Sequence, residues 1–470
     1  MSEQNEECVP LKERVLFAIS AIPDQMTYQA FSLLVFTYYW TVIGLEFWVY
    51  VGFFIWTGWN MINDPILGAL AERTKQKGKL GKRKFYLILS IGPLALSMFF
   101  LFWVPFSRGA NVSTFVYFVA IIILFEFFYT LFDVNVNSIF PEQFPSEDKR
   151  AQTNVLIKGF TVFGIMLAAI PSLGPQTPAK ASISELRTLF PIWGIYLALI
   201  TVAFAIPFIL WGVKEKEELD SDFEKRPGFL KSLKITLTNK TFVKFVVANT
   251  MIWTTFNTLI TIFPLYFEYV VDVPKDLLFM KTVSLISALI VAALVLPFHR
   301  WLGKKYGMRN ALMITLGAWI VLLLPYFFIT PGMGMTGVIL GLVITASQGF
   351  GLGGALFYVD IIHGDIIDQD ALEFGVKRSG AFYGINALIH RASTIFTMLI
   401  IMIAFSPTNW SGQYSVTAGV NVILALKVII FVFPALANLI AIGFFAWYKL
   451  HGERLMRMRD ELQKHPRLCS

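Results

Sequence analysis

Charged residues and cysteines are scarce in this sequence, and each shortage excludes a class of protein. Asp, Glu, Lys and Arg make up 15% of the 470 residues. A soluble domain has roughly 25%, so a soluble globular fold is excluded. Cys8 and Cys469, the two cysteines, lie in polar end segments, which excludes a disulfide framework and a cysteine-rich metal site. The first residues have no apolar core, so we expect no cleavable signal peptide.

Long apolar stretches are abundant. Hydrophobic residues form 56% of the chain, and runs of about 20 of them are each long enough to cross a bilayer as a helix. The runs are continuous rather than alternating, which favours helices over strands. We predict an all-α, multi-pass protein of the cell membrane with twelve transmembrane helices, near residues 15–42, 47–71, 84–106, 113–140, 152–171, 188–212, 241–270, 277–298, 310–330, 336–362, 380–405 and 422–448.

Polar connections between the runs carry most of the positive charge. Residues 72–84, residues 299–309 and the tail beyond residue 449 are rich in Lys and Arg. Such loops stay in the cytoplasm, so both termini are predicted to be cytoplasmic. The formal charge of +8 therefore indicates membrane topology rather than nucleic-acid binding. The basic connection recurs two helices into each half, which is a weak internal repeat.

The longest polar segment divides the predicted helices into two sets of six. We predict an N-terminal six-helix bundle over residues 1–213, a cytoplasmic linker over 214–238, a C-terminal six-helix bundle over 239–450 and a basic cytoplasmic tail over 451–470. Two such bundles with a site near the middle of the membrane are typical of secondary transporters.

Ionisable residues inside the predicted helices are informative, because each costs about a few kcal/mol in a bilayer and usually faces a cavity or a partner. Asp24 follows Pro23 within the first helix, where the proline weakens the helical hydrogen bonds beside a carboxylate. We favour a contact with substrate or ion. The alternative is that the helix begins later and that Asp24 is its N-cap.

The second helix carries hard oxygen ligands. Asn60 and Asp64 are four residues apart and share one face, Asn63 adds a neighbouring oxygen, and Pro65 removes a backbone donor. Such oxygens suit Na⁺, and Asp64 alone can carry a proton. We favour a coupling-ion site over a structural hydrogen bond between helices.

The fourth helix carries a polar stripe. Glu126, Thr130, Asp133 and Asn137 follow one another at intervals of four, three and four, so they lie on one helix face. Two carboxylates, a hydroxyl and an amide on one face favour the lining of a solute pathway over helix-to-helix contacts.

Two cations are candidates to pair with these carboxylates. Lys158 and Arg391 each lie one to two turns inside a predicted helix. The alternative is that their side chains extend to the membrane surface.

No enzyme is predicted, because no catalytic constellation stands out. His363, Asp365 and Asp368 resemble a metal site only in spacing, and we interpret them as a solvated connection after the tenth helix. Gly351 and Gly353 are predicted to let helices approach closely rather than to bind phosphate. A membrane sensor that binds a solute without moving it stays an alternative, because it needs the same pocket.

Two segments carry a family resemblance. Residues 63–88, NDPILGALAERTKQKGKLGKRKFYLI, and residues 129–133, YTLFD, resemble the glycoside-pentoside-hexuronide:cation symporters of the major facilitator superfamily. The resemblance covers the first half well and the second half thinly. It implies the superfamily's fold of two six-helix bundles and the symport of a small solute, a sugar or glycoside, with H⁺ or Na⁺ by alternating access.

The resemblance also implies a cation site. Asn63, Asp64 and Thr130 match positions that hold the co-transported cation, and Asn60 stands where the family has a second aspartate. Asp64 is the expected metal ligand if the cation is Na⁺. No resident cofactor is expected.

The substrate site follows in the same way. Asp24 and Asp133 match the family's sugar-binding carboxylates, Lys158 stands where the family has an arginine, and Arg391 where it has a lysine. Asn137 replaces a stacking tryptophan, which speaks against galactosides.

Three further expectations complete the prediction. Glu72 and Arg73, at the end of the second helix, are predicted to form a cytoplasmic gate. The protein is expected to act as a monomer in the lipid bilayer without a nucleic-acid partner. The segment FFLFWVPFSRG and the aromatic content of 16% also resemble the lysophospholipid carriers of the family's eukaryotic branch, so a lipid-like substrate is the alternative.

Overall fold

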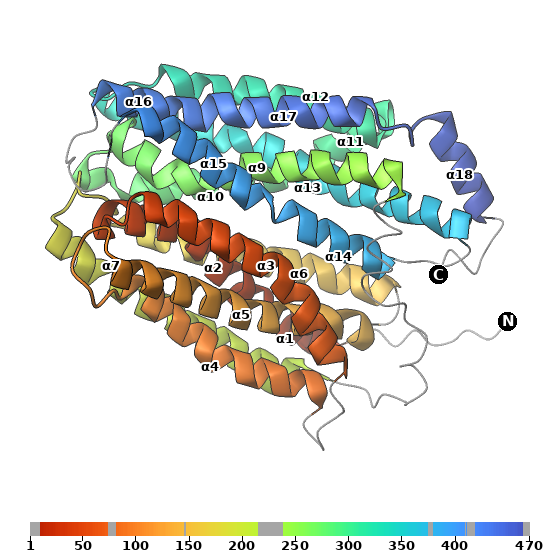
Figure 1. Ribbon diagram of the computed structural model, residues 1–470. Coiled ribbons are helices and arrows are strands. Elements are labelled where there is room, and N and C mark those ends of the chain that lie inside the picture. The colour runs from red at the N-terminus through yellow and green to blue at the C-terminus, as the bar shows by residue number, and fades with distance from the viewer. Residues whose placement is uncertain are drawn as a thin grey trace. The chain divides into compact units, whose positions relative to one another are not determined.

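The computed structural model describes residues 10–73, 81–144, 147–214, 238–374, 379–408, 410 and 419–463 (Figure 1). All regular secondary structure in these residues is helical, which confirms the all-α prediction for them. The chain forms two compact units. The first comprises Met1–Pro171 and Ala181–Lys225, and the second comprises Ser172–Lys180 and Arg226–Ser470. Most of the predicted linker lies outside the described residues.

The first unit is built from seven α-helices and short π-helical turns within the described residues. They are α1 (Leu11–Ala18), α2 (Ala21–Ala30), η1 (Phe31–Val35), η2 (Tyr38–Ile43), α3 (Phe47–Arg73), α4 (Lys82–Phe102), α5 (Val112–Gln143), α6 (Glu147–Ala169), α7 (Ile183–Pro207) and η5 (Phe208–Gly212). The 3₁₀ turn η4 (Ile170–Leu173) leads from α6 into the segment Ser172–Lys180 of the second unit.

The second unit follows the same plan with more interruptions. Its elements are α9 (Lys240–Tyr269), η7 (Lys275–Leu277), α10 (Phe279–Leu294), α11 (Leu296–Tyr306), α12 (Met308–Leu323), η8 (Leu324–Phe328), α13 (Gly334–Phe374), α14 (Ser379–His390), α15 (Ser393–Phe405), η9 (Ser406–Thr408), α16 (Val420–Lys427), η10 (Val428–Val432), α17 (Phe433–Ala446) and α18 (Glu453–Gln463).

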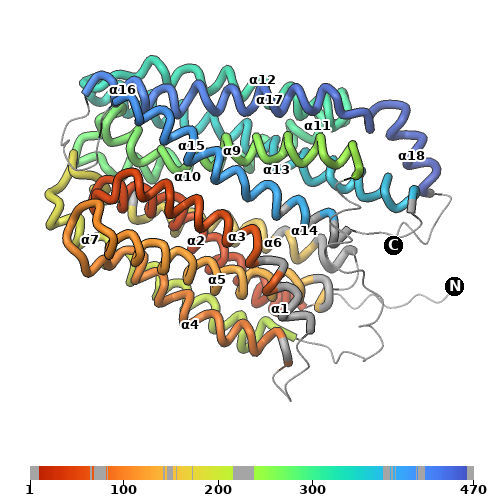
Figure 2. Tube along the Cα trace, viewed as in Figure 1, coloured from red at the N-terminus to blue at the C-terminus, as the bar shows by residue number. Residues whose placement is uncertain are grey.

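Helix packing repeats from one unit to the other. In the first unit α5 packs on α3 and α4, and α7 packs on α4 and α2. In the second, α13 packs on α10 and α12, and α17 packs on α12 and α9; α12 and α17 lie side by side in Figures 1 and 2. Each of the named helices of the first unit thus corresponds to the helix of the second unit that follows it by six predicted spans in the chain. The weak repeat of the basic connections therefore corresponds to a repeat of structure.

Ten helices in the described part of the chain are long and apolar enough to cross a membrane. Large apolar side chains such as Leu199 and Val321 are exposed on them, as expected of groups that contact lipid. The first predicted span is divided between shorter elements, and α3 contains side chains outside the described set. Twelve spans and cytoplasmic termini stay predictions.

The first predicted span is interrupted beside Asp24, as the proline suggested. Helix α1 ends at Ala18, α2 begins at Ala21, and Asp24 lies in the first turn of α2. The Thr27 hydroxyl donates to the Pro23 carbonyl oxygen at 2.8 Å. Because α1 precedes Asp24, the alternative that Asp24 caps the start of the first helix is wrong.

The tenth helix is longer than predicted. Helix α13 continues past residue 362 to Phe374, and His363, Asp365 and Asp370 are buried along this extension. The interpretation of this segment as a solvated connection is therefore wrong. Its acidic residues belong to the part of α13 that extends beyond the apolar run and is still packed against other residues. Hydropathy does not indicate how far the helix continues there.

Glycines of α13 permit close helix contact, as predicted. A Cβ atom added to Gly353 would lie 2.5 Å from the Ala292 carbonyl oxygen of α10. A Cβ atom on Gly351 would overlap the Trp319 ring of α12. Small residues at such positions let helix backbones approach in a membrane.

Replacing Gly353 with alanine should lower the free energy of unfolding by about 1–3 kcal/mol, because backbone atoms must move to admit the methyl group. Gly317→Ala is the matched control, since a Cβ there has no neighbour within 4 Å. Unfolding of the purified variants in mixed micelles measures both. Equal stability of the two variants would contradict the close contact.

Candidate functional site

Glu126 lies at the centre of a buried polar cluster in the first unit. This residue of α5 is fully buried. Its carboxylate accepts hydrogen bonds from Trp56 Nε1 at 3.1 Å and from Thr130 Oγ1 at 3.2 Å. Asn63 Nδ2 donates to the Glu126 backbone oxygen at 3.3 Å. The cluster therefore joins α3 to α5 through one acidic residue.

One face of α3 supplies the other half of this cluster. Trp56, Asn60 and Asn63 are spaced by four and three residues, so they lie on the same helix face. Asn60 is buried, and its Oδ1 has no hydrogen-bond partner among the described residues. A carboxylate, a hydroxyl and an amide oxygen in a buried site are the ligands that Na⁺ or a proton relay requires.

Part of the predicted cation site lies at this contact between α3 and α5. Asn63 bonds to Glu126, Thr130 bonds to Glu126, and Asn60 lies on the same face of α3. The side chain of Asp64 lies outside the described set, as do those of Glu72 and Arg73.

The two predicted substrate carboxylates of the first unit share one tyrosine. Tyr129 of α5 is within electrostatic reach of both Asp24 and Asp133 and interacts with the Asp24 carboxylate. Asp24 Oδ2 accepts a hydrogen bond from Gln25 Nε2 at 2.7 Å, while its Oδ1 is buried without a hydrogen-bond partner among the described residues. Asp133 Oδ1 accepts from Asn137 Nδ2 at 2.6 Å. The structure thus brings three of the predicted substrate residues together.

A row of aromatic rings connects the two polar groups. Tyr129 stacks on Tyr28 with 5.3 Å between ring centroids, and Phe125 stacks on Phe31 at 4.8 Å. Phe31 also contacts Trp56, the residue that donates to Glu126. Phe125 also stacks on Tyr129 at 5.8 Å, so packed rings link the two predicted substrate carboxylates with the Glu126 cluster.

The two predicted cations differ in what the structure says of them. Lys158 of α6 is exposed and forms no ion pair with any described residue. Arg391 belongs to the second unit, at the break between α14 and α15. Its approach to Asp24 or Asp133 stays a prediction.

Arg391 is flanked by a polar seam that the sequence analysis did not find. Asn249 of α9 bonds to Asn386 at 3.0 Å, and Asn257 bonds to Ser393 at 2.9 Å. The broken helix and these amides resemble the interrupted helices that line transporter binding sites. The sequence did contain a signal for this seam, because Asn249 and Asn257 are eight residues apart in the seventh predicted span and so lie near one helix face.

A buried ion pair in the second unit was also missed. Lys281 Nζ lies 2.7 Å from Glu268 Oε1, and both side chains are fully buried. Glu268 also accepts from the Gln176 backbone N–H at 3.0 Å and from Thr177 Oγ1 at 2.5 Å. Opposite charges at the facing ends of two consecutive spans were the signal in the sequence.

No group of three or more His, Cys, Asp or Glu side chains within the described ranges is arranged to hold a metal ion. His363 and Asp365 of α13 point to separate partners, the rings of Phe242 and Phe245 for the imidazole and Arg459 for the carboxylate. The metal-like spacing at this helix end therefore has no counterpart in the described structure.

Known proteins match the chain over nearly its whole length. It is 22% identical to the sodium-dependent lysophosphatidylcholine symporter 1-A of Danio rerio, over 98% of this chain and 90% of that protein. It is 22% identical to the raffinose carrier protein of Pediococcus pentosaceus, over 82% of this chain and 59% of that protein. The crystal structure of the nucleoside transporter NupG superposes with a TM-score of 0.65 at 12% identity and covers 93% of this chain and 100% of that chain.

The helix packing, the acidic cluster and these relatives agree with one assignment. The family profile described as MFS/sugar transport protein matches residues 16–452. The chain belongs to this family of the major facilitator superfamily and is a multi-pass membrane transporter protein.

Proposed function

We propose that the protein is a cation-coupled symporter that moves a small polar solute, of the sugar or glycoside class, by alternating access. The observation that carries this proposal is the pair of acidic groups in the first unit: a buried cluster around Glu126 and a substrate-type pair, Asp24 and Asp133, on Tyr129. The raffinose carrier among the relatives supports the sugar class.

The coupling ion binds at the α3–α5 contact in this proposal. Asn60, Asn63, Asp64 and Thr130 supply oxygen ligands, and Glu126 adds a carboxylate. The family has an aspartate where this chain has Asn60, so Glu126 restores the charge that Asn60 lacks. Either H⁺ or Na⁺ satisfies this ligand set, with Asp64 as a metal ligand for Na⁺.

The solute binds beside Asp24 and Asp133, whose carboxylates accept hydrogen bonds from hydroxyl groups. Asn137 orients Asp133 through its 2.6 Å hydrogen bond. Lys158 and Arg391 complete the site in the working cycle, and Glu72 and Arg73 form the cytoplasmic gate. The working unit is a monomer with twelve spans and both termini in the cytoplasm.

Coupling arises from charge neutralisation. An acidic cluster is costly to enclose in a closing, low-dielectric cavity, and a bound cation removes that cost. The solute then crosses only when the cation is bound, because each ligand favours the same occluded state.

A lysophospholipid is the second candidate substrate. The relative from Danio rerio carries lysophosphatidylcholine by its name, and the first unit contains a continuous set of packed rings that suits an acyl chain. The ring of Phe53 contacts those of Phe31, Trp56 and Phe118.

Uptake into proteoliposomes tests the proposal. Radiolabelled glycosides, pentoses, uronates and lysophospholipids are offered with an imposed Na⁺ or H⁺ gradient. Accumulation of one sugar class that collapses with the gradient supports the proposal. Lysophospholipid uptake alone supports the second candidate, and binding without counterflow would show a sensor.

Asp133→Asn should reduce uptake of the accepted solute at least about tenfold, because one charged hydrogen bond contributes about 1.5–3 kcal/mol. The control is Asp276→Asn, an exposed acid outside the described site, which should leave uptake unchanged. Full uptake by the Asp133 variant would remove this residue from the solute site.

A further inference from the structure

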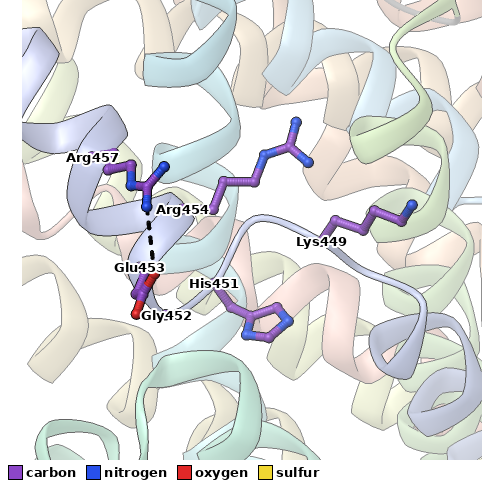
Figure 3. A pocket seen from close by; sticks show the side chains of 6 residues that line it. All are labelled: Lys449, His451, Gly452, Glu453, Arg454 and Arg457. Carbon is purple, nitrogen blue, oxygen red and sulfur yellow. Dashed lines mark ion pairs between the residues drawn. The ribbon is translucent and has the colours of Figure 1, made fainter.

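A surface hollow lies just beyond the last predicted span. It has a volume of about 580 Å³ and is lined by Lys449, His451, Gly452, Glu453, Arg454 and Arg457. Figure 3 shows that Lys449 and His451 come from the turn after α17, while Arg454 and Arg457 come from α18. The residues of the hollow belong to the end of the second unit, whereas Glu126, Asp24 and Asp133 belong to the first.

Several contacts hold the walls of this hollow in place. The Arg309 guanidinium donates to the carbonyl oxygens of Phe445 at 2.6 Å and Ala446 at 2.7 Å. Lys244 Nζ donates to the Trp447 carbonyl oxygen at 2.9 Å. Because these bonds tie the end of α17 to α9 and α12, the following turn starts from a fixed point.

Helix α18 is bonded to α13 near its middle. Arg459 forms an ion pair of 2.7 Å with Asp365 of α13. Met458 is 6% exposed and faces the protein, whereas Met456 is 59% exposed and faces outward. One side of α18 is therefore packed against the second unit, so the helix that lines the hollow is held in place.

The charge of the hollow favours an anion. The lining contains three basic side chains, Lys449, Arg454 and Arg457, and one carboxylate, that of Glu453. Glu453 lies 3.6 Å from Arg457, which offsets one of these charges (Figure 3). Partial burial, and then the neighbouring Arg309, lower the pKa of His451, so its imidazole is neutral near pH 7 and offers a hydrogen-bond donor without charge.

The hollow follows directly on an apolar helix. The candidate membrane span Val420–Ala446 ends three residues before Lys449, and Trp447 is 69% exposed directly after it, as is typical of an aromatic residue at the membrane surface. Three residues of chain from Ala446 to Lys449 span at most about 10 Å. The headgroup layer on each side of a bilayer is roughly 5–8 Å thick, so Lys449 at the edge of the hollow is within reach of lipid headgroups if the candidate span crosses the membrane.

We propose that this hollow binds the phosphodiester headgroup of an anionic phospholipid. The guanidinium groups of Arg454 and Arg457 bond the phosphate oxygens, since arginine matches phosphate with paired N–H donors. Lys449 adds attraction, and His451 donates to a headgroup oxygen. The acyl chains extend past Trp447 along α17. A basic pocket next to a span is the kind of site that holds such lipids.

Titration of phosphatidylglycerol into the full-length protein in detergent, read by native mass spectrometry, tests this site. Arg454→Gln/Arg457→Gln should weaken binding roughly thirtyfold, because each basic residue near the headgroup contributes about one factor of five to ten. Glu453→Gln should bind more tightly, since it removes the opposing charge and releases Arg457. This gain cannot come from misfolding.

The matched control is Lys304→Gln/Lys305→Gln, which removes the same charge from an exposed part of α11. It should bind phosphatidylglycerol as the unmodified protein does. Equal loss in this control would show diffuse surface attraction and overturn the site, as would unchanged binding by the Arg454/Arg457 variant. Inorganic phosphate and phosphatidylcholine should not compete; competition by inorganic phosphate alone would identify a free-anion site and overturn the lipid assignment.

Discussion

Replacing Glu126 with glutamine should abolish cation-driven accumulation of the solute while the protein stays folded. The side chain keeps its shape and its bond with Thr130, but the cluster loses a full negative charge. A cation about 4 Å from this carboxylate would lose roughly 4 kcal/mol at the dielectric effective in proteins, which lowers its affinity about a thousandfold. Uptake driven by an imposed Na⁺ or H⁺ gradient measures the loss.

Solute exchange separates a coupling role from a structural one. Counterflow needs no gradient, and a neutral glutamine at this position removes the charge that the bound cation otherwise neutralises, so Glu126→Gln should retain exchange when substrate is present on both sides. Glu185→Gln, an exposed acid at the start of α7, is the matched control and should accumulate normally. Normal accumulation by the Glu126 variant would mean that this residue does not bind the coupling ion and only joins α3 to α5.

The polar stripe of the fourth span was predictable because helix geometry fixes it. Residues four apart lie on one face of any α-helix, and the structure shows the expected contacts from Thr130 to Glu126 and from Asn137 to Asp133. The interruption before Asp24 was equally local, since proline acts on its own helix. These two predictions of local geometry needed only the periodicity of one helix, and the structure agrees with both.

Contacts between helices were not available from the sequence in the same way. Nothing in the spacing of Trp56 and Glu126 indicates that the indole N–H meets the carboxylate, and no spacing indicates that Tyr129 interacts with both Asp24 and Asp133. Such pairs depend on how two helices rotate against each other. The extent of α13 was missed for a related reason, because contacts with other helices continue this helix after its apolar run has ended.

The ion pair of Glu268 and Lys281 illustrates the limit most clearly. Both residues lie near the ends of predicted spans, where a charge is normally solvated and carries little information. The structure instead buries both and adds bonds from the Gln176 backbone and Thr177. The Lys281 ammonium also donates to the Gly174 carbonyl oxygen at 3.1 Å. A segment between the fifth and sixth spans is thereby bonded to the second unit, which no pattern within either span predicts.

Removing one charge of this pair should destabilise the protein strongly. Glu268→Gln leaves the Lys281 ammonium buried without its anion, and Lys281→Met leaves the carboxylate without its cation. Each should lower the free energy of unfolding by about 3–5 kcal/mol, the cost of an uncompensated charge in a protein interior. Unfolding of the purified variants in mixed micelles measures the change.

The double variant Glu268→Gln/Lys281→Met distinguishes lost charge balance from lost packing. With both charges gone, the desolvation cost disappears as well, so the double variant should be more stable than either single variant. Asp272→Asn is the control, because it breaks an ion pair with Lys180 in which the carboxylate is half-exposed. This variant should lower the free energy of unfolding by no more than about 1 kcal/mol. The contrary result is that the double variant loses the sum of the free energies of unfolding lost by the two single variants. The pair would then contribute through the shape of its side chains rather than through charge, and neutral hydrogen bonds alone would hold the segment Ser172–Lys180.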